Sequence, residues 1–152
     1  MDHLELGDLL KECLNGVLEA HPVALAYLYG SAASGRATPL SDVDIALVME
    51  EEGFDPARRL DIELKIEDQL VQACEIADLD VRIINQAPIM VRGEVVTNGI
   101  LLYSRDEVLR VEFETSTRSV YFDFMPVATM HQKATFDRLL QRGLNGQRRE
   151  NP

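Results

Sequence analysis

A glycine–serine pair followed, after ten intervening residues, by two aspartates is the feature that most constrains this chain. Gly30-Ser31 ends the apolar run ALAYLY, and Asp42-Val43-Asp44 begins the apolar run DVDIALVM. Short apolar runs that are rich in Val, Ile and Leu and bounded by Gly, Pro or Ser are typical of buried strands. The sequence therefore predicts strands over residues 24–29 and 42–49, with a polar turn after the first and two carboxylates at the start of the second.

The two aspartates share one face of the second strand because side chains alternate along a strand. The Cα atoms of Asp42 and Asp44 should lie about 6.5–7 Å apart, and their carboxylates repel each other unless a cation lies between them. Mg²⁺ prefers a few carboxylates together with the phosphate oxygens of a substrate. Two such ions about 3.5–4 Å apart can activate an attacking oxygen and stabilise a leaving one. The pair therefore predicts a magnesium site for phosphoryl or nucleotidyl transfer.

The glycine–serine turn supplies the features of a phosphate site. Gly30 allows a sharp turn and the close approach of a phosphate, and Ser31 offers a hydroxyl and an N–H donor. The small residues over 31–34 can form a short helix, which Gly35 would end, and the N-terminus of a helix attracts anions. We therefore expect a nucleoside triphosphate to bind at this turn, beside the metal site.

A third carboxylate occurs in the later apolar run 79–85, LDVRIIN. If this strand pairs beside 42–49, Asp80 joins the aspartate pair and can bind a metal or accept a proton from an attacking hydroxyl. Asp78 competes for this role because it shares the face of Asp80. We favour Asp80, which lies further into the apolar run. Arg82 is also on this face and could pair with a carboxylate or meet a phosphate.

The spacing Gly30-Ser31, ten residues, Asp42-x-Asp44, with Asp80 on a later strand, resembles that of the DNA polymerase β-like nucleotidyltransferase superfamily. The short chain and two later patterns, Asn85-x-Ala87-Pro88 and Gly99-Ile-Leu-Leu-Tyr103, resemble the minimal nucleotidyltransferases (MNT), the MntA-type antitoxins encoded with HEPN-domain toxins. The resemblance spans most of residues 5–125. It implies an α+β fold in which a small mixed β-sheet is backed by helices.

The resemblance also implies a role for each site residue. Gly30 and Ser31 would bind the triphosphate, Asp42 and Asp44 would bind Mg²⁺, and Asp80 would be the base and a further metal ligand. Two more positions belong to this comparison. Ser41 matches the superfamily pattern and is expected to contact the nucleotide or the loop backbone. Many relatives have Ala-Arg-Gly where this chain has Ala33-Ser34-Gly35-Arg36, so the role of Arg36 stays open.

The activity that the resemblance implies is the transfer of AMP from ATP to a tyrosine of a HEPN ribonuclease, which silences that toxin. This chain would then be a Mg²⁺-dependent protein adenylyltransferase that forms a hetero-oligomer with its toxin. Two alternatives remain. The chain could mask the toxin by binding alone, or it could transfer a nucleotide to a small molecule such as an aminoglycoside.

Composition sets further limits on the partners. The 152 residues contain 26 acidic and 15 basic side chains, a net charge of −11. This acidity argues against direct nucleic-acid binding, because phosphate contacts need Lys and Arg. No apolar run is long enough to span a membrane and the N-terminus is acidic, so we expect no membrane partner and a cytoplasmic location. Cys13 and Cys74 form no CxxC pair and are expected to be buried thiols in a reducing compartment.

The remaining segments predict a helical scaffold in one domain, 1–142, with a flexible tail over 143–152. Helices are expected over 4–20, 55–73 and 88–97, an edge strand over 100–103, and a helix from about residue 106. Ser104 with Glu107 resembles a capping box. Pro126 should break or kink the last helix, with a further helix over 127–141. The aromatic cluster Tyr121, Phe122 and Phe124 is either core or a docking face.

Overall fold

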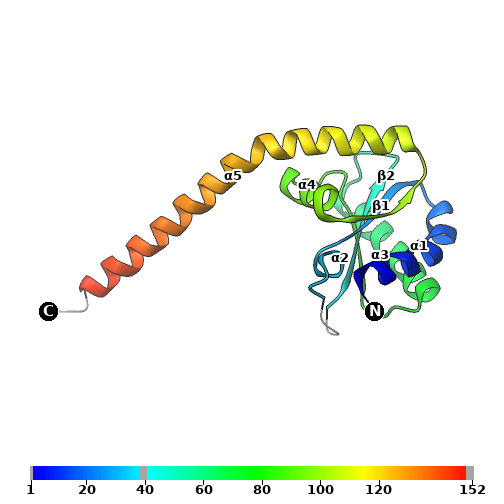
Figure 1. The fold of residues 1–152 in the computed structure, drawn as a ribbon, viewed down its shortest axis with the longest axis horizontal. Coiled ribbons are helices and arrows are strands. Elements are labelled where there is room, and N and C mark those ends of the chain that lie inside the picture. The colour runs from blue at the N-terminus through cyan, green and yellow to red at the C-terminus, as the bar shows by residue number, and fades with distance from the viewer. Residues whose placement is uncertain (1, 38–40, 150–152) are drawn as a thin grey trace.

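The computed structural model describes residues 2–37 and 41–149 and contains a mixed four-stranded sheet of order β3-β2-β1-β4 (Figure 1). The central strand β1 (Val23–Tyr29) runs antiparallel to both β2 (Val43–Met49) and β4 (Ile100–Ser104). The edge strand β3 (Leu79–Ile83) runs parallel to β2. The prediction of an α+β fold with a small mixed sheet is confirmed, and so is the edge position of the strand after residue 99.

Helices cover both faces of this sheet. They are α1 (His3–Glu19), α2 (Ser31–Ser34), α3 (Pro56–Cys74), α4 (Ile89–Asn98) and α5 (Glu107–Arg149). One apolar core joins α1 and α3 to the strand face that carries Leu28 and Leu47. The other lies on the opposite face, which carries Tyr27 and Val48, beneath α4 and the start of α5. Because β1 and β2 are buried on both faces, their sequences read as continuous apolar runs.

Aspartate side chains cap the starts of α1, α3 and α5. The Asp2 side chain accepts the backbone N–H groups of the first turn of α1, and Asp55 caps α3 with Pro56 at its first position. At α5 the expected cap was wrong: Asp106, not Ser104, accepts the backbone N–H groups at the start of the helix, with its Oδ1 2.9 Å from the nitrogen of Val108. Asp106 sits directly before the first helical residue, which is where a cap must lie.

Helix α5 is continuous for 43 residues even though Pro126 lies inside it. Figure 1 shows that the helix bends near its middle and that the half beyond the bend projects away from the domain. Proline removes one helical hydrogen bond and crowds the preceding turn, so a bend without a break is the expected compromise. The helix also extends into 143–149, and the division into a domain and a flexible tail at residue 143 stays a prediction.

The two cysteines form a disulfide between α1 and α3, so the expectation of free thiols was wrong. Cys13 and Cys74 are 61 residues apart in sequence, with their Cα atoms 5.2 Å apart. The two helices pack side by side on the same face of the sheet, which brings these positions together. In the part of the chain that the structure describes, no helix is long and apolar enough to cross a membrane.

Candidate active site

The sheet register brings the predicted carboxylates together on the face that α4 and α5 cover. Asp44 of β2 pairs across the sheet with Tyr29 of β1 on one side and with Asp80 of β3 on the other. Residues paired in this way point to the same face. Asp42 lies just before β2 and is exposed, whereas Asp44 and Asp80 are half-buried. The prediction that Asp80 lies beside the aspartate pair is therefore correct in its geometry.

The alternative carboxylate, Asp78, lies outside β3 and is exposed. Its backbone oxygen accepts a hydrogen bond from the Val43 N–H, at 2.8 Å, which joins the residue before β3 to the first residue of β2. Ser41 is half-buried and directly precedes Asp42. Asp80 therefore pairs with Asp44 across the sheet, whereas Asp78 lies two residues earlier in the chain, before β3 begins.

The electrostatics of this row favour a cation. Burial raises the pKa of Asp44, and the charges of Asp80 and Asp42 raise it further, with Arg82 opposing them. The pKa of Tyr29 is raised by burial and then by Asp44 and Asp80. Arg82, a nearby opposing charge, places its Nε 3.3 Å from Oδ2 of Asp80. Oxygen donors of this kind suit a hard divalent ion, although no three such side chains in the described residues converge as they stand.

The turn after β1 lies close to Asp44 and has a backbone conformation that favours glycine. Gly30 has a φ of +73°, a conformation that other residues rarely adopt, and a Cβ added to it would lie 2.8 Å from Oδ2 of Asp44. Helix α2 begins directly after it and ends at Gly35, which is in the left-handed conformation. The predicted turn and short helix are present, and they place Ser31 next to the aspartates.

A cavity of about 490 Å³ opens beside this turn. Its lining comes from the end of β1, from α2 and the residues after it, and from α4; the lining residues are Tyr29, Gly30, Ser31, Ser34, Arg36, Glu94, Asn98 and Gly99. This volume lies within the range of small-molecule sites. The cavity is thus bounded by the glycine–serine turn on one side and by α4 on the other.

Arg36, Glu94 and Asn98 are among the lining residues that had not been assigned a role from the sequence. Arg36, whose role was open, donates from Nε to the Ser34 hydroxyl at 3.1 Å and so stays at the cavity. Glu94 and Asn98 lie one turn apart on α4, and the Asn98 amide donates to the Glu94 carboxylate at 2.9 Å. No sequence signal marked them, because they look like the ordinary solvent face of a helix. Their place in the site depends on how α4 packs on the sheet.

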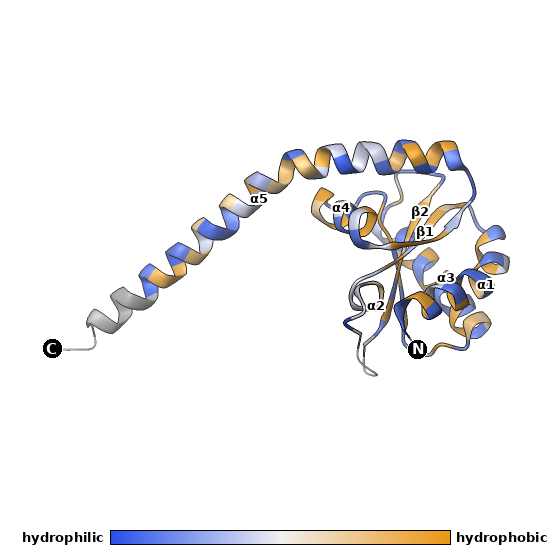
Figure 2. Cartoon of the chain, viewed as in Figure 1, coloured by the Kyte–Doolittle hydropathy of each residue, from blue (hydrophilic) through white to orange (hydrophobic). Residues whose placement is uncertain are grey.

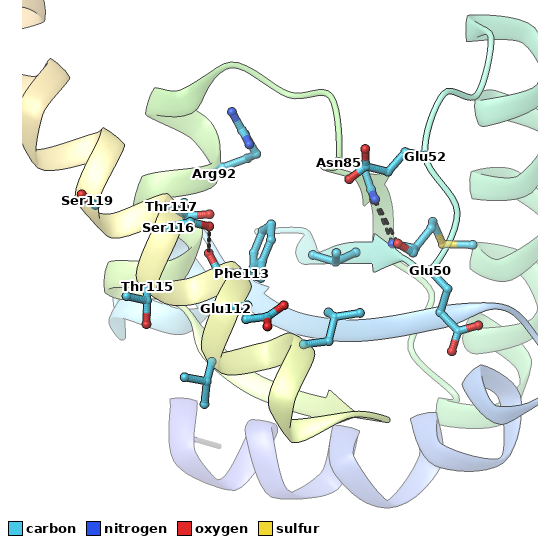
Figure 3. A pocket seen from close by; sticks show the side chains of 14 residues that line it. Glu50, Glu52, Asn85, Arg92, Glu112, Phe113, Thr115, Ser116, Thr117 and Ser119 are labelled. Carbon is cyan, nitrogen blue, oxygen red and sulfur yellow. Dashed lines mark hydrogen bonds between the residues drawn. The ribbon is translucent and has the colours of Figure 1, made fainter.

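A larger cavity, of about 840 Å³, lies at the opposite end of β2 (Figure 3). It is bounded by Met49, by Asn85 and Arg92, and by one face of α5 from Leu109 to Ser119. The Asn85 side chain binds both backbone groups of Met49, at 2.8 and 3.0 Å. Asn85, one of the residues behind the family resemblance, therefore holds strand β2 in place. This cavity is remote from the three aspartates, so the smaller one is the candidate active site.

Comparison with known proteins identifies the family and the fold of this chain. A sequence profile of the family described as polymerase beta, nucleotidyltransferase matches residues 12–108. None of the curated proteins matches this chain. A solved toxin–antitoxin structure with AMP-PNP is 23% identical, with a TM-score of 0.63, over 86% of this chain and 98% of its own. A tri-AMPylated Shewanella oneidensis HEPN toxin in complex with MNT antitoxin contains a chain that is 21% identical, with a TM-score of 0.60, over 88% and 98%. These structures share the fold of this chain.

Proposed function

This chain belongs to the polymerase β nucleotidyltransferase family, and from that membership we propose that it transfers AMP from ATP to a tyrosine of a HEPN-family toxin and so acts as its antitoxin. The observation that carries the proposal is the row Asp44–Asp80, with Asp42 directly before it, beside the cavity at Gly30. The likeness to a structure that contains a tri-AMPylated HEPN toxin supports the identity of the acceptor.

The residues divide into two groups with different tasks. Gly30 and Ser31 bind the triphosphate through backbone and hydroxyl donors, because the glycine lets a phosphate approach the chain. Asp42, Asp44 and Asp80 hold Mg²⁺, which when bound neutralises the charge of the triphosphate. Asp80 also accepts the proton of the attacking hydroxyl, since its carboxylate is in line with Asp44 at the edge of the site.

Arg82 keeps Asp80 in place until substrate arrives. Its Nε lies 3.3 Å from the Asp80 carboxylate, and both side chains are partly exposed. Such a pair contributes little stability in water, so Asp80 can leave it to bind a cation. Ser41 supports the nucleotide side of the site from its position before Asp42. Glu94 and Asn98 of α4 form the wall of the cavity across from the glycine–serine turn, and the nucleoside binds against this wall.

A second candidate function is masking of the toxin by binding alone. The observation that favours it is the exposed apolar surface of α5 beyond Tyr121, where Phe122 and Phe136 are 53% and 61% exposed. Both functions need contact with the toxin, and they differ in whether AMP is transferred.

The test is to incubate the chain with ATP, Mg²⁺ and the HEPN-family protein encoded beside it, and to measure intact masses. We expect the partner to gain AMP, and we expect Asp44→Asn to abolish this gain because it removes a metal ligand. Asp78→Asn is the matched control, since it neutralises a neighbouring aspartate outside the row, and it should retain transfer. A stable inhibited complex without any mass gain would support masking and overturn the proposed transfer.

A further inference from the structure

The part of α5 beyond Tyr121 lacks the packing that holds the part before it. In the first half, Phe113, Thr117 and Tyr121 face the domain at four-residue intervals, and the latter two are buried. Tyr121 packs against Gly93 of α4, where any side chain would collide with its ring. Beyond Tyr121, no side chain that the structure describes is buried. The half that projects in Figure 1 is therefore held only through its own helix.

The part of α5 beyond Tyr121 carries large apolar side chains that are between 42% and 71% exposed: Phe122, Phe124, Val127, Met130, Phe136, Leu139 and Leu140. Figure 2 shows apolar residues along the projecting half as well as over the domain. Successive helical residues are about 100° apart around the axis, so the apolar side chains of 120–130 point in all directions. Asp123 is the one charge in that stretch. A helix that is apolar all round is a buried helix, which calls for a partner that encloses it.

The charges beyond this stretch indicate what that partner is like. Lys133, Arg138 and Arg142 follow it, with Asp137 as the one acid among residues 131–142. Residues 1–130, in contrast, contain 24 acidic and 10 basic side chains. A second copy of this chain would bring two strongly acidic bodies together, which like-charge repulsion disfavours. A different protein fits this helix when it has an apolar groove for residues 120–130 and an acidic surface for the basic residues that follow.

The projecting half also begins beside the candidate active site. The Tyr121 hydroxyl donates to Oε2 of Glu94 at 3.4 Å, and Glu94 lines the cavity next to the glycine–serine turn. A protein that encloses the helix just after Tyr121 therefore lies against α4, on the side where the nucleotide cavity opens. This position suits the delivery of an acceptor side chain to that cavity.

We propose that residues 122–140 of α5 form a docking arm for the acceptor protein, which encloses them in an apolar groove with an acidic far end. The proposal rests on the proposed function for the identity of the acceptor. It adds the surface of this chain that binds the acceptor and the chemistry of the complementary surface. Exposed aromatic side chains at the start and toward the end of the arm, Phe122 and Phe136, are its anchors, since buried aromatics dominate interface energies.

The experiment compares two double variants of the full chain. Phe122→Ser with Phe136→Ser alters the arm, and Leu60→Ser with Leu64→Ser is the matched control, because those leucines are 52% and 55% exposed on α3. Binding to the HEPN-family protein encoded beside this chain is measured by calorimetry, together with MgATP binding and AMP transfer. We expect the arm variant to bind the partner at least about 30-fold more weakly, as loss of a hot spot does, with unchanged MgATP affinity. The control should match the original chain.

The outcomes separate the two proposals. If the original chain binds the partner but transfers no AMP, the proposed transfer fails, and the binding comparison still tests the arm. If transfer occurs and the arm variant binds as tightly as the control, the arm is overturned. Sedimentation of the chain alone tests whether a second copy of this chain binds the arm instead. If the original chain is a dimer and the arm variant is a monomer, this surface is a self-association site and the proposal is overturned.

Discussion

Single residues at the site show how far the chemistry could be predicted from the sequence. The sequence predicted that Asp42, Asp44 and Asp80 lie together, because two apolar runs carry carboxylates near their starts. Alternate residues of a strand point to the same face, which placed these carboxylates on one side of the sheet. The register of β2 with β3 places Asp80 beside Asp44, and a common metal site for all three aspartates stays a prediction. Glu94 and Asn98 were missed because their place at the cavity depends on the packing of α4, and no local pattern encodes that.

The crowding of carboxylates makes a prediction for Asp44. Its pKa is raised by burial first, and then by Asp80 and Asp42. A carboxyl with a raised folded-state pKa contributes stability below the unfolded value, near pH 3.9, and this stability is lost as the pH rises through the folded-state value. Without metal, Asp44→Asn should therefore stabilise the fold at pH 7, by less than about 1 kcal/mol because the site is partly hydrated.

Urea unfolding in EDTA at pH 7 and at pH 3.5 measures this difference. The gain from Asp44→Asn should be present at pH 7 and much smaller at pH 3.5, where the carboxyl of the original chain is mostly protonated in both states. Asp78→Asn, at an exposed position outside the row, is the control. Equal stability of Asp44→Asn and the original chain at pH 7 would contradict the inferred repulsion.

At the scale of elements, an edge strand is protected by side chains of a neighbouring helix. Strand β3 is the outer strand of the sheet, and its outward N–H groups would otherwise be open to pairing with another chain. Glu67 accepts from the Val81 N–H at 3.2 Å, and Glu63 accepts from the Ile83 N–H at 3.0 Å. Glu63 is buried, so this contact explains why a glutamate occupies a core-facing position of α3.

Removal of both acceptors should therefore destabilise the fold and expose the edge. We expect Glu63→Ala with Glu67→Ala to lower the free energy of unfolding by about 2 kcal/mol, because donors at a buried edge lose their partners. We also expect association at high concentration, which size-exclusion chromatography with light scattering would detect. Asp61→Ala, on the same helix and exposed, should change neither. An unchanged urea midpoint in the double variant would show that water replaces these acceptors fully.

Element boundaries agree with the sequence where caps and glycines mark them, and they differ where tertiary packing decides. The helices at 3–19 and 56–74 and the short helix at 31–34 are within a residue or two of their predicted ends. The course of α5 was harder to predict. Pro126 is compatible with either a break or a bend, and the choice depends on what lies around it.

At the scale of the whole molecule, the chain has an acidic domain and a projecting helical half. A buried network ties the first part of α5 to the central strand: the Tyr27 hydroxyl donates to the carboxylate of Glu114 at 2.9 Å, and Arg110 pairs with the other oxygen at 3.0 Å. Burial and this hydrogen bond to Glu114 raise the pKa of Tyr27, so it stays a donor. The sequence predicted an aromatic cluster near Tyr121 as core or docking face, and the structure divides it, with Tyr121 buried and Phe122 and Phe124 exposed.

The disulfide between α1 and α3 has a topological consequence. Cys13 and Cys74 are the ends of a covalent ring that contains all of β1, α2 and β2, and with them the glycine–serine turn and two of the three aspartates. A protease that cuts the backbone once inside this ring leaves one connected molecule. Gel electrophoresis after such a cut should show a single band of full mass, which separates into two fragments only after a reductant is added. Two fragments without reductant would mean that the ring is open in solution.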